Sequence, residues 1–103
     1  MKKLAKWFMN RLNTIAEHNG HDRIFTATEG NAMGLWTQCD LIAREYLNNG
    51  GGSAKGFLGI TRAECIKCYD YMCANRETLI ELDYVNKKGW NNFGFPLWDN
   101  YQF

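Results

Sequence analysis

Residues 61–85, TRAECIKCYDYMCANRETLIELDYV, contain the two patterns that decide the predicted fold. Thr61 followed by Glu64 is a capping box, in which each side chain binds a backbone amide of the first helical turn. We therefore expect a helix that begins at Thr61 and runs to about Asn75. Its inner face would hold Cys65, Tyr69, Met72 and Cys73.

The second half of this stretch alternates between apolar and acidic residues. Ile80, Leu82 and Tyr84 fall on one side, while Glu81 and Asp83 fall on the other. This period of two is typical of a half-buried strand, and a helix is the alternative. Residues 86–89, NKKG, then resemble a hairpin turn that leads into a further strand over residues 90–95.

Two helices and a strand are expected before this stretch. Residues 2–18 place apolar side chains three and four positions apart, which predicts an amphipathic helix: Leu4, Trp7, Phe8, Leu12 and Ile15. Asn19 and Gly20 supply its stop signal. Residues 22–28 (DRIFTAT) are rich in β-branched and aromatic residues and predict a strand, and residues 32–48 predict a second helix.

The predicted order is α-β-α-α-β-β, which indicates an α+β fold with three helices packed on a small three-stranded antiparallel sheet. This order resembles the topology of the winged-helix family. The resemblance implies a helix-turn-helix, a hairpin that serves as the wing, and a dimeric DNA-binding transcriptional regulator. The glycine-rich break at residues 48–56 (NNGGGSAKG) departs from the tight turn of that family.

Length and composition indicate one globular domain. The chain has 103 residues, of which 46% are hydrophobic and 15% aromatic, with a single proline. A chain of this length forms one core, so residues 1–103 are expected to be a single domain. Residues 48–56 are expected to be a flexible surface loop, because three consecutive glycines allow many backbone conformations.

Charge and cysteine usage narrow the function classes. The formal net charge is +1, whereas domains that bind nucleic acid by themselves are usually strongly basic. We find no signal peptide and no transmembrane stretch, so we expect a cytoplasmic protein with reduced thiols and no membrane partner.

A zinc site is an alternative interpretation of the cysteines. Two spacings, Cys65-x-x-Cys68 and Cys68-x-x-x-x-Cys73, suggest ligands, but on a helix Cys73 lies about 140° around the axis from Cys68. The alternative site would therefore combine Cys65 and Cys68 with two of Cys39, His18 and His21, of which Cys39 and His21 are the first choice. We favour the simpler interpretation that the cysteines are buried in the core, with no metal and no cofactor.

Catalytic motifs are not recognisable. His18 and His21 have no motif that links them to a cysteine, and the only serine, Ser53, lies in the glycine-rich loop. The loop also lacks the glycine, lysine and hydroxyl spacing of a phosphate-binding P-loop. We therefore predict that the protein is not an enzyme.

Two sets of residues are candidates for binding a macromolecule. The C-terminal segment is unusually aromatic and charged, which is typical of protein interfaces. The candidates for binding a protein partner are Lys87, Lys88, Trp90, Trp98 and Tyr101. If the protein instead binds DNA, the candidates are Arg62, Lys67, Arg76, Lys87 and Lys88.

The favoured function is that of a small interaction protein which binds and modulates or inhibits a larger protein or nucleoprotein complex. In size and composition the chain looks like accessory proteins of bacteriophages and mobile elements, including anti-CRISPR proteins. Direct DNA binding as a winged-helix regulator is the first alternative, and a zinc-stabilised module is the second. The sequence leaves a homodimer open.

Overall fold

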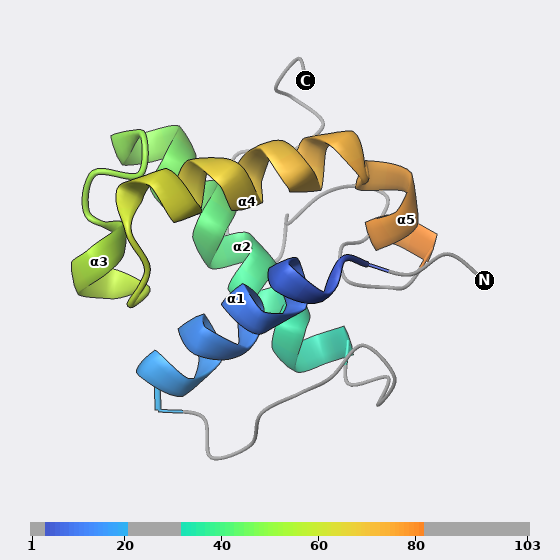
Figure 1. Ribbon diagram of the computed structural model, residues 1–103, viewed down its shortest axis with the longest axis horizontal. Coiled ribbons are helices and arrows are strands. Elements are labelled where there is room, and N and C mark those ends of the chain that lie inside the picture. The colour runs from blue at the N-terminus through green and yellow to red at the C-terminus, as the bar shows by residue number, and fades with distance from the viewer. Residues whose placement is uncertain (1–3, 21–31, 82–103) are drawn as a thin grey trace.

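The computed structural model describes residues 4–20 and 32–81. These ranges form helices α1 (Lys6–His18), α2 (Ala32–Asn49), α3 (Ala54–Phe57), α4 (Arg62–Ala74) and α5 (Arg76–Glu81). Helix α2 packs against both α1 and α4. Figure 1 shows α3 and α5 near opposite ends of α4. The described part of the chain is therefore a small all-helical domain.

Helix α1 follows from its apolar periodicity, and the structure confirms the predicted inner face. Phe8, Leu12 and Ile15 are fully buried, and the ring of Phe8 lies 4.6 Å from that of Tyr71 in α4. The Tyr71 hydroxyl accepts a hydrogen bond of 2.6 Å from the backbone N–H of Ala5. The start of α1 is thus attached to α4 through both apolar and polar contacts.

Helix α4 begins as the capping box predicts. The Thr61 hydroxyl accepts a hydrogen bond of 3.1 Å from the Glu64 N–H, and Glu64 Oε1 accepts one of 2.8 Å from the Thr61 N–H. The Glu64 carboxylate also forms an ion pair of 2.6 Å with Arg11 of α1. These hydrogen bonds and the ion pair lower the pKa of Glu64. A cap of this kind contributes about 1 kcal/mol to stability.

The glycine-rich segment expected as a flexible loop contains the end of α2, a turn and most of α3. The backbone reverses at Gly50 and Gly51, whose φ angles are 59° and 85°, a conformation that glycine adopts without a steric penalty. The N–H groups of Gly50 and Gly51 donate to the carbonyls of Tyr46 and Glu45. This hydrogen bonding ends α2 and directs the chain into α3.

The prediction of a strand over residues 78–85 (TLIELDYV) is wrong where the structure describes that segment, which is residues 78–81. Residues 76–81 form α5, in which Thr78 and Leu79 are both buried while Glu77 and Glu81 are exposed. Two adjacent inward side chains do not fit a strand, and two exposed glutamates four residues apart fit one face of a helix. The helical alternative is the correct one here. As a residue of α5, Leu79 is buried in the same apolar cluster as the inner face of α4.

The predicted α+β fold class is therefore wrong, and so is the winged-helix topology. No strand occurs within residues 4–20 and 32–81, and helix α5 includes the first residues of the segment predicted as the second strand. The strand expected over residues 22–28 and the hairpin expected over residues 86–95 lie outside the described residues. Of the helices that the structure describes, none is long and apolar enough to span a membrane.

Candidate functional site

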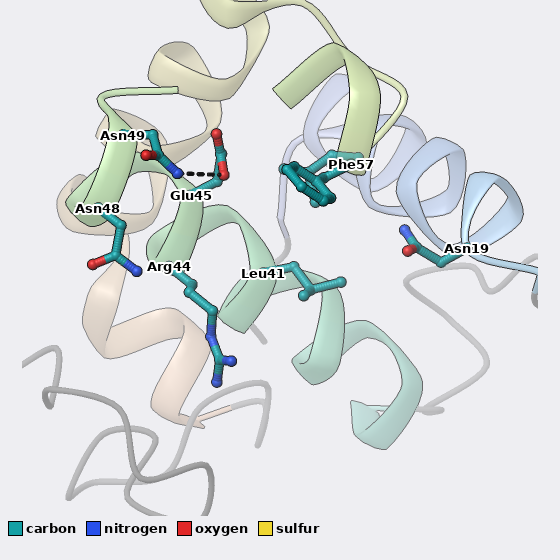
Figure 2. Close-up of a pocket in the computed structure, with 8 residues that line it drawn as sticks. Asn19, Leu41, Arg44, Glu45, Asn48, Asn49 and Phe57 are labelled. Atoms are coloured by element: carbon teal, nitrogen blue, oxygen red, sulfur yellow. Dashed lines mark hydrogen bonds between the residues drawn. The ribbon is translucent and has the colours of Figure 1, made fainter. Parts of the chain in front are cut away.

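A surface pocket of about 270 Å³ lies where α2, α3 and the end of α1 meet. We call it the Phe57 pocket; it is lined by Asn19, Leu41, Arg44, Glu45, Asn48, Asn49, Phe57 and Leu58. Figure 2 shows the Phe57 ring and Leu41 facing one another across the pocket. The Phe57 side chain is 66% exposed, and it is the one large apolar side chain exposed among the described residues.

Contacts with α1 and α2 hold α3, and therefore Phe57, in place. The ring nitrogen Nε2 of His18 lies 3.1 Å from the carbonyl oxygen of Gly56. On the other side, the Ser53 N–H donates a hydrogen bond of 2.8 Å to Glu45 Oε1. Leu58, the residue after Phe57, is buried in the core. A helix of four residues is thereby fixed with its aromatic side chain directed outward.

The polar side chains that line the Phe57 pocket are one buried carboxylate, three asparagine amides and one guanidinium group. Glu45 is only 8% exposed, and its second oxygen, Oε2, accepts a hydrogen bond of 3.2 Å from Asn49 Nδ2. Asn19 Nδ2 donates to the Ile15 carbonyl at 2.7 Å. Asn19 and Asn49 each use one of their two amide N–H donors in these bonds, so each keeps one N–H and a carbonyl oxygen for a ligand.

The cation of the pocket, Arg44, is paired with a buried carboxylate. Arg44 Nη2 lies 3.3 Å from Asp40 Oδ2, one helical turn earlier in α2. The Asp40 residue is only 2% exposed, and no described residue hydrogen-bonds its other oxygen, Oδ1. Burial raises the pKa of Asp40 to about 6, although the positive charge of Arg44 partly opposes this.

Stability should therefore depend on the protonation of Asp40. The folded state binds this proton more tightly than the unfolded state, so the stabilising contribution is fully present below pH 3.8 and is lost as the pH rises through about 6. The difference between the two pKa values corresponds to about 3 kcal/mol at most. Asp40→Asn should remove this dependence and be more stable than the wild type above pH 6.

Urea unfolding of both proteins between pH 4 and pH 7.5 measures this effect. The wild-type free energy of unfolding, minus that of Asp40→Asn, should fall steadily between pH 4 and pH 6 and then level off. A difference that does not change with pH would show that Asp40 keeps an ordinary pKa in the folded protein.

Three of the four cysteines belong to the core: Cys39, Cys65 and Cys68 are fully buried. The predicted inner face of α4 is therefore wrong at one position, because Cys68 is buried and Cys73 is partly exposed. Burial raises the pKa of Cys65 to about 11 and that of Cys68 to about 12, and it also raises that of Cys39. Within the described residues, no three His, Cys, Asp or Glu side chains are arranged to hold a metal ion. His21 of the zinc alternative lies outside those residues.

In the folded protein, we expect one cysteine thiol to be alkylated quickly and the other three to be alkylated slowly. Cys73 is partly exposed, whereas Cys39, Cys65 and Cys68 are buried and protonated, and only the thiolate is nucleophilic. Alkylation with iodoacetamide at pH 8, followed by mass spectrometry of the peptides, should modify Cys73 first and the other three only at the rate of unfolding. Rapid modification of Cys65 or Cys68 would contradict this burial.

Three of the candidates for binding nucleic acid are described, and each contacts a different part of the protein. Arg62 Nε donates to the Gly50 carbonyl at 3.3 Å, and Arg76 forms an ion pair with Glu77 at 3.3 Å. Lys67 Nζ lies 4.3 Å from the centre of the Trp7 ring. On α4, Lys67 also has acidic residues three positions before and after it, Glu64 and Asp70. Negative charge therefore surrounds the centre of the predicted DNA-binding face.

The candidates for binding a protein partner are not in the described part of the chain. Lys87, Lys88, Trp90, Trp98 and Tyr101 all lie outside the described residues, so their role stays a prediction. Sequence reasoning did not select Phe57. A signal was present, because Phe57 is a large aromatic residue in a segment of small residues and on no apolar stripe.

Comparisons with known proteins add no family to this description. The chain matches no protein-family model, and neither curated proteins nor solved structures give a significant match. Within the described residues, the fold and the Phe57 pocket together define a small helical domain with an aromatic side chain at the edge of a pocket that contains a buried carboxylate.

Proposed function

We propose that this chain is a non-enzymatic interaction protein that binds a larger protein or nucleoprotein complex through the Phe57 pocket and modulates or inhibits that complex. The exposed ring of Phe57 carries the proposal. Exposed aromatic side chains beside a pocket are typical of interface hot spots, because they bury a large area on binding and lose little conformational entropy. The likeness in size and composition to phage accessory proteins supports an anti-defence role.

The rigid support of Phe57 strengthens this proposal. Its helix is attached to α1 by His18 and to α2 by the hydrogen bond from Ser53 to Glu45. An interface residue that is already held in place needs little ordering when a partner binds, which favours affinity. The structure thus presents the ring outward without requiring α3 to refold.

An affinity pull-down from host lysate tests the proposal, with and without nuclease. Tagged wild-type protein should retain one protein complex that survives nuclease, and Phe57→Ala should retain it at least about tenfold less. Lys55→Ala is the matched control, because Lys55 is an exposed residue of the same helix and does not line the pocket. Circular dichroism should show equal helicity in all three proteins.

Two results would contradict this function. One is equal capture of the complex by the wild type and by Phe57→Ala. The other is retention of nucleic acid alone that high salt releases, which would point to phosphate contacts. The same pull-down with alanine substitutions at Trp98, and at Lys87 and Lys88, tests the C-terminal candidates separately.

A further inference from the structure

We infer that the Phe57 pocket binds an arginine side chain of the partner protein, with its guanidinium group between the Glu45 carboxylate and the face of the Phe57 ring. This inference rests on the proposed function and names the chemistry of the partner. Three properties of the pocket support it: the spare acceptor capacity of the Glu45 oxygens, the charge of Glu45 and the exposed aromatic ring.

The acceptors of the pocket match a group that only donates. Each carboxylate oxygen of Glu45 accepts one hydrogen bond, from Ser53 or from Asn49. Since a carboxylate oxygen has two lone pairs, both oxygens keep capacity for another donor. The carbonyl oxygens of Asn19 and Asn49 add two further acceptors at the lining. A guanidinium group has five N–H donors in a planar fork, and it has no acceptor.

The charge of Glu45 favours a cation over a neutral donor. Glu45 is buried, and among the described residues its hydrogen-bond donors are the neutral groups of Asn49 and Ser53. A buried carboxylate without a cation interacts strongly with a positive charge placed beside it, because the surroundings screen that attraction poorly. Arg44 does not fill this role, because it pairs with Asp40 and points away from Glu45 in Figure 2.

The aromatic ring and the size of the pocket favour arginine in particular. A guanidinium group is planar and weakly hydrated, so it stacks on an aromatic face better than an ammonium group does. Leu41 and Leu58 provide apolar surface for the methylene stem of the side chain. The pocket volume of about 270 Å³ is small against the roughly 300–1,000 Å³ of sites for small molecules and cofactors. A single long side chain fits this space.

Titration of the full chain with short peptides, followed by nuclear magnetic resonance, tests this inference. The probes are acetyl-Gly-Arg-Gly-amide and the same peptide with citrulline, the neutral isostere of arginine. The arginine peptide should shift the backbone amide signals of Glu45, Asn49 and Phe57. It should bind at least about tenfold more tightly than the citrulline peptide, because a desolvated charged pair contributes more than 1.4 kcal/mol.

Two variants separate the contributions of charge and ring. Glu45→Gln keeps an oxygen for the Ser53 N–H but removes the charge, so it should bind the arginine peptide only as weakly as the citrulline peptide. Phe57→Leu keeps an apolar side chain on the surface and removes the ring, so it should weaken arginine binding by about threefold to tenfold. Lys55→Gln is the control and should bind as the wild type does.

Equal binding of the two peptides, or binding of neither, would overturn the arginine inference. Unchanged binding by Glu45→Gln would do the same, and Phe57→Leu keeps the test valid if Glu45→Gln fails to fold. These outcomes are distinct from failure of the proposed function. If Phe57→Ala loses the captured complex while the peptides show no preference for arginine, the pocket binds a protein through other chemistry.

Discussion

Replacing Phe8 by alanine is expected to lower the free energy of unfolding by about 3–5 kcal/mol. Phe8 is fully buried in α1 and lies against Trp7 and Tyr71. Removing the ring forfeits its transfer free energy and leaves a cavity between α1 and α4 that a well-packed core fills only in part. Since a chain of this length has a total stability of about 5–15 kcal/mol, this is a large share.

The same substitution at Phe57 is the matched control. Phe57 is 66% exposed, so Phe57→Ala should change stability by less than about 0.5 kcal/mol. Thermal unfolding followed by circular dichroism should show Phe8→Ala melting more than about 12 °C below the wild type and Phe57→Ala melting close to it. If both variants melt like the wild type, then α1 does not pack as the structure shows.

Gly59→Ala is the second substitution with a large expected effect, about 2–4 kcal/mol of destabilisation. The φ angle of Gly59 is 79°, which costs an alanine roughly 1 kcal/mol. A Cβ atom at this position would also lie 2.7 Å from Cγ and 2.8 Å from Cβ of His18. Those atoms belong to the stem of the side chain and to the ring attached to α1, so the clash requires α1 and α3 to separate.

Gly20→Ala isolates the backbone cost from the steric cost. Gly20 has a φ angle of 85°, and no atom lies within 4 Å of the position its Cβ would take. Gly20→Ala should therefore cost only about 1 kcal/mol. Urea unfolding of Gly59→Ala in a His18→Gly background, compared with His18→Gly alone, should give a cost close to that of Gly20→Ala, because both the Cβ and the ring atoms of residue 18 are then absent. Full additivity of the two substitutions would refute the close approach of His18.

The main helices were predictable because their signals are local. The capping box at Thr61 and Glu64 places the start of α4, and the apolar spacing of residues 4–15 identifies the buried face of α1. The second predicted helix, residues 32–48, agrees with α2 to within one residue. In each case the hydrogen bonds and the periodicity involve residues within four positions of one another.

The segment after Asn75 was not predictable in the same way. Residues 78–85 satisfy the period of two that a strand requires, but the first four of them lie in the helix α5 (Arg76–Glu81). A strand needs a neighbouring strand for its backbone hydrogen bonds, whereas a helix satisfies them internally. Among the described elements, the neighbours are helices, and Leu79 gains burial beside α4 as a helical residue.

The candidate site depended even more on tertiary structure. No local pattern links Asn19 at the end of α1, Glu45 in α2 and Phe57 in α3, which are separated by many positions in the chain. The sequence also does not show that Glu45 uses its side chain to bind the Ser53 N–H, because that contact requires the turn at Gly50 and Gly51. The aromatic residues that the sequence indicates for binding, Trp90, Trp98 and Tyr101, lie outside the described residues, and no sequence motif indicates Phe57.

The sequence by itself determined the amphipathic helices α1 and α2, the burial of Cys39 and Cys65, and the start of α4. These properties depend on apolar periodicity and on side chains that cap their own helix. Tertiary structure decided that residues 76–81 are helical, that Asp40 is buried beside Arg44, and that α3 presents Phe57 outward. The physical reason is that the burial of a side chain and its hydrogen-bond partners depend on which elements pack together. That packing is set by contacts between residues that are distant in sequence.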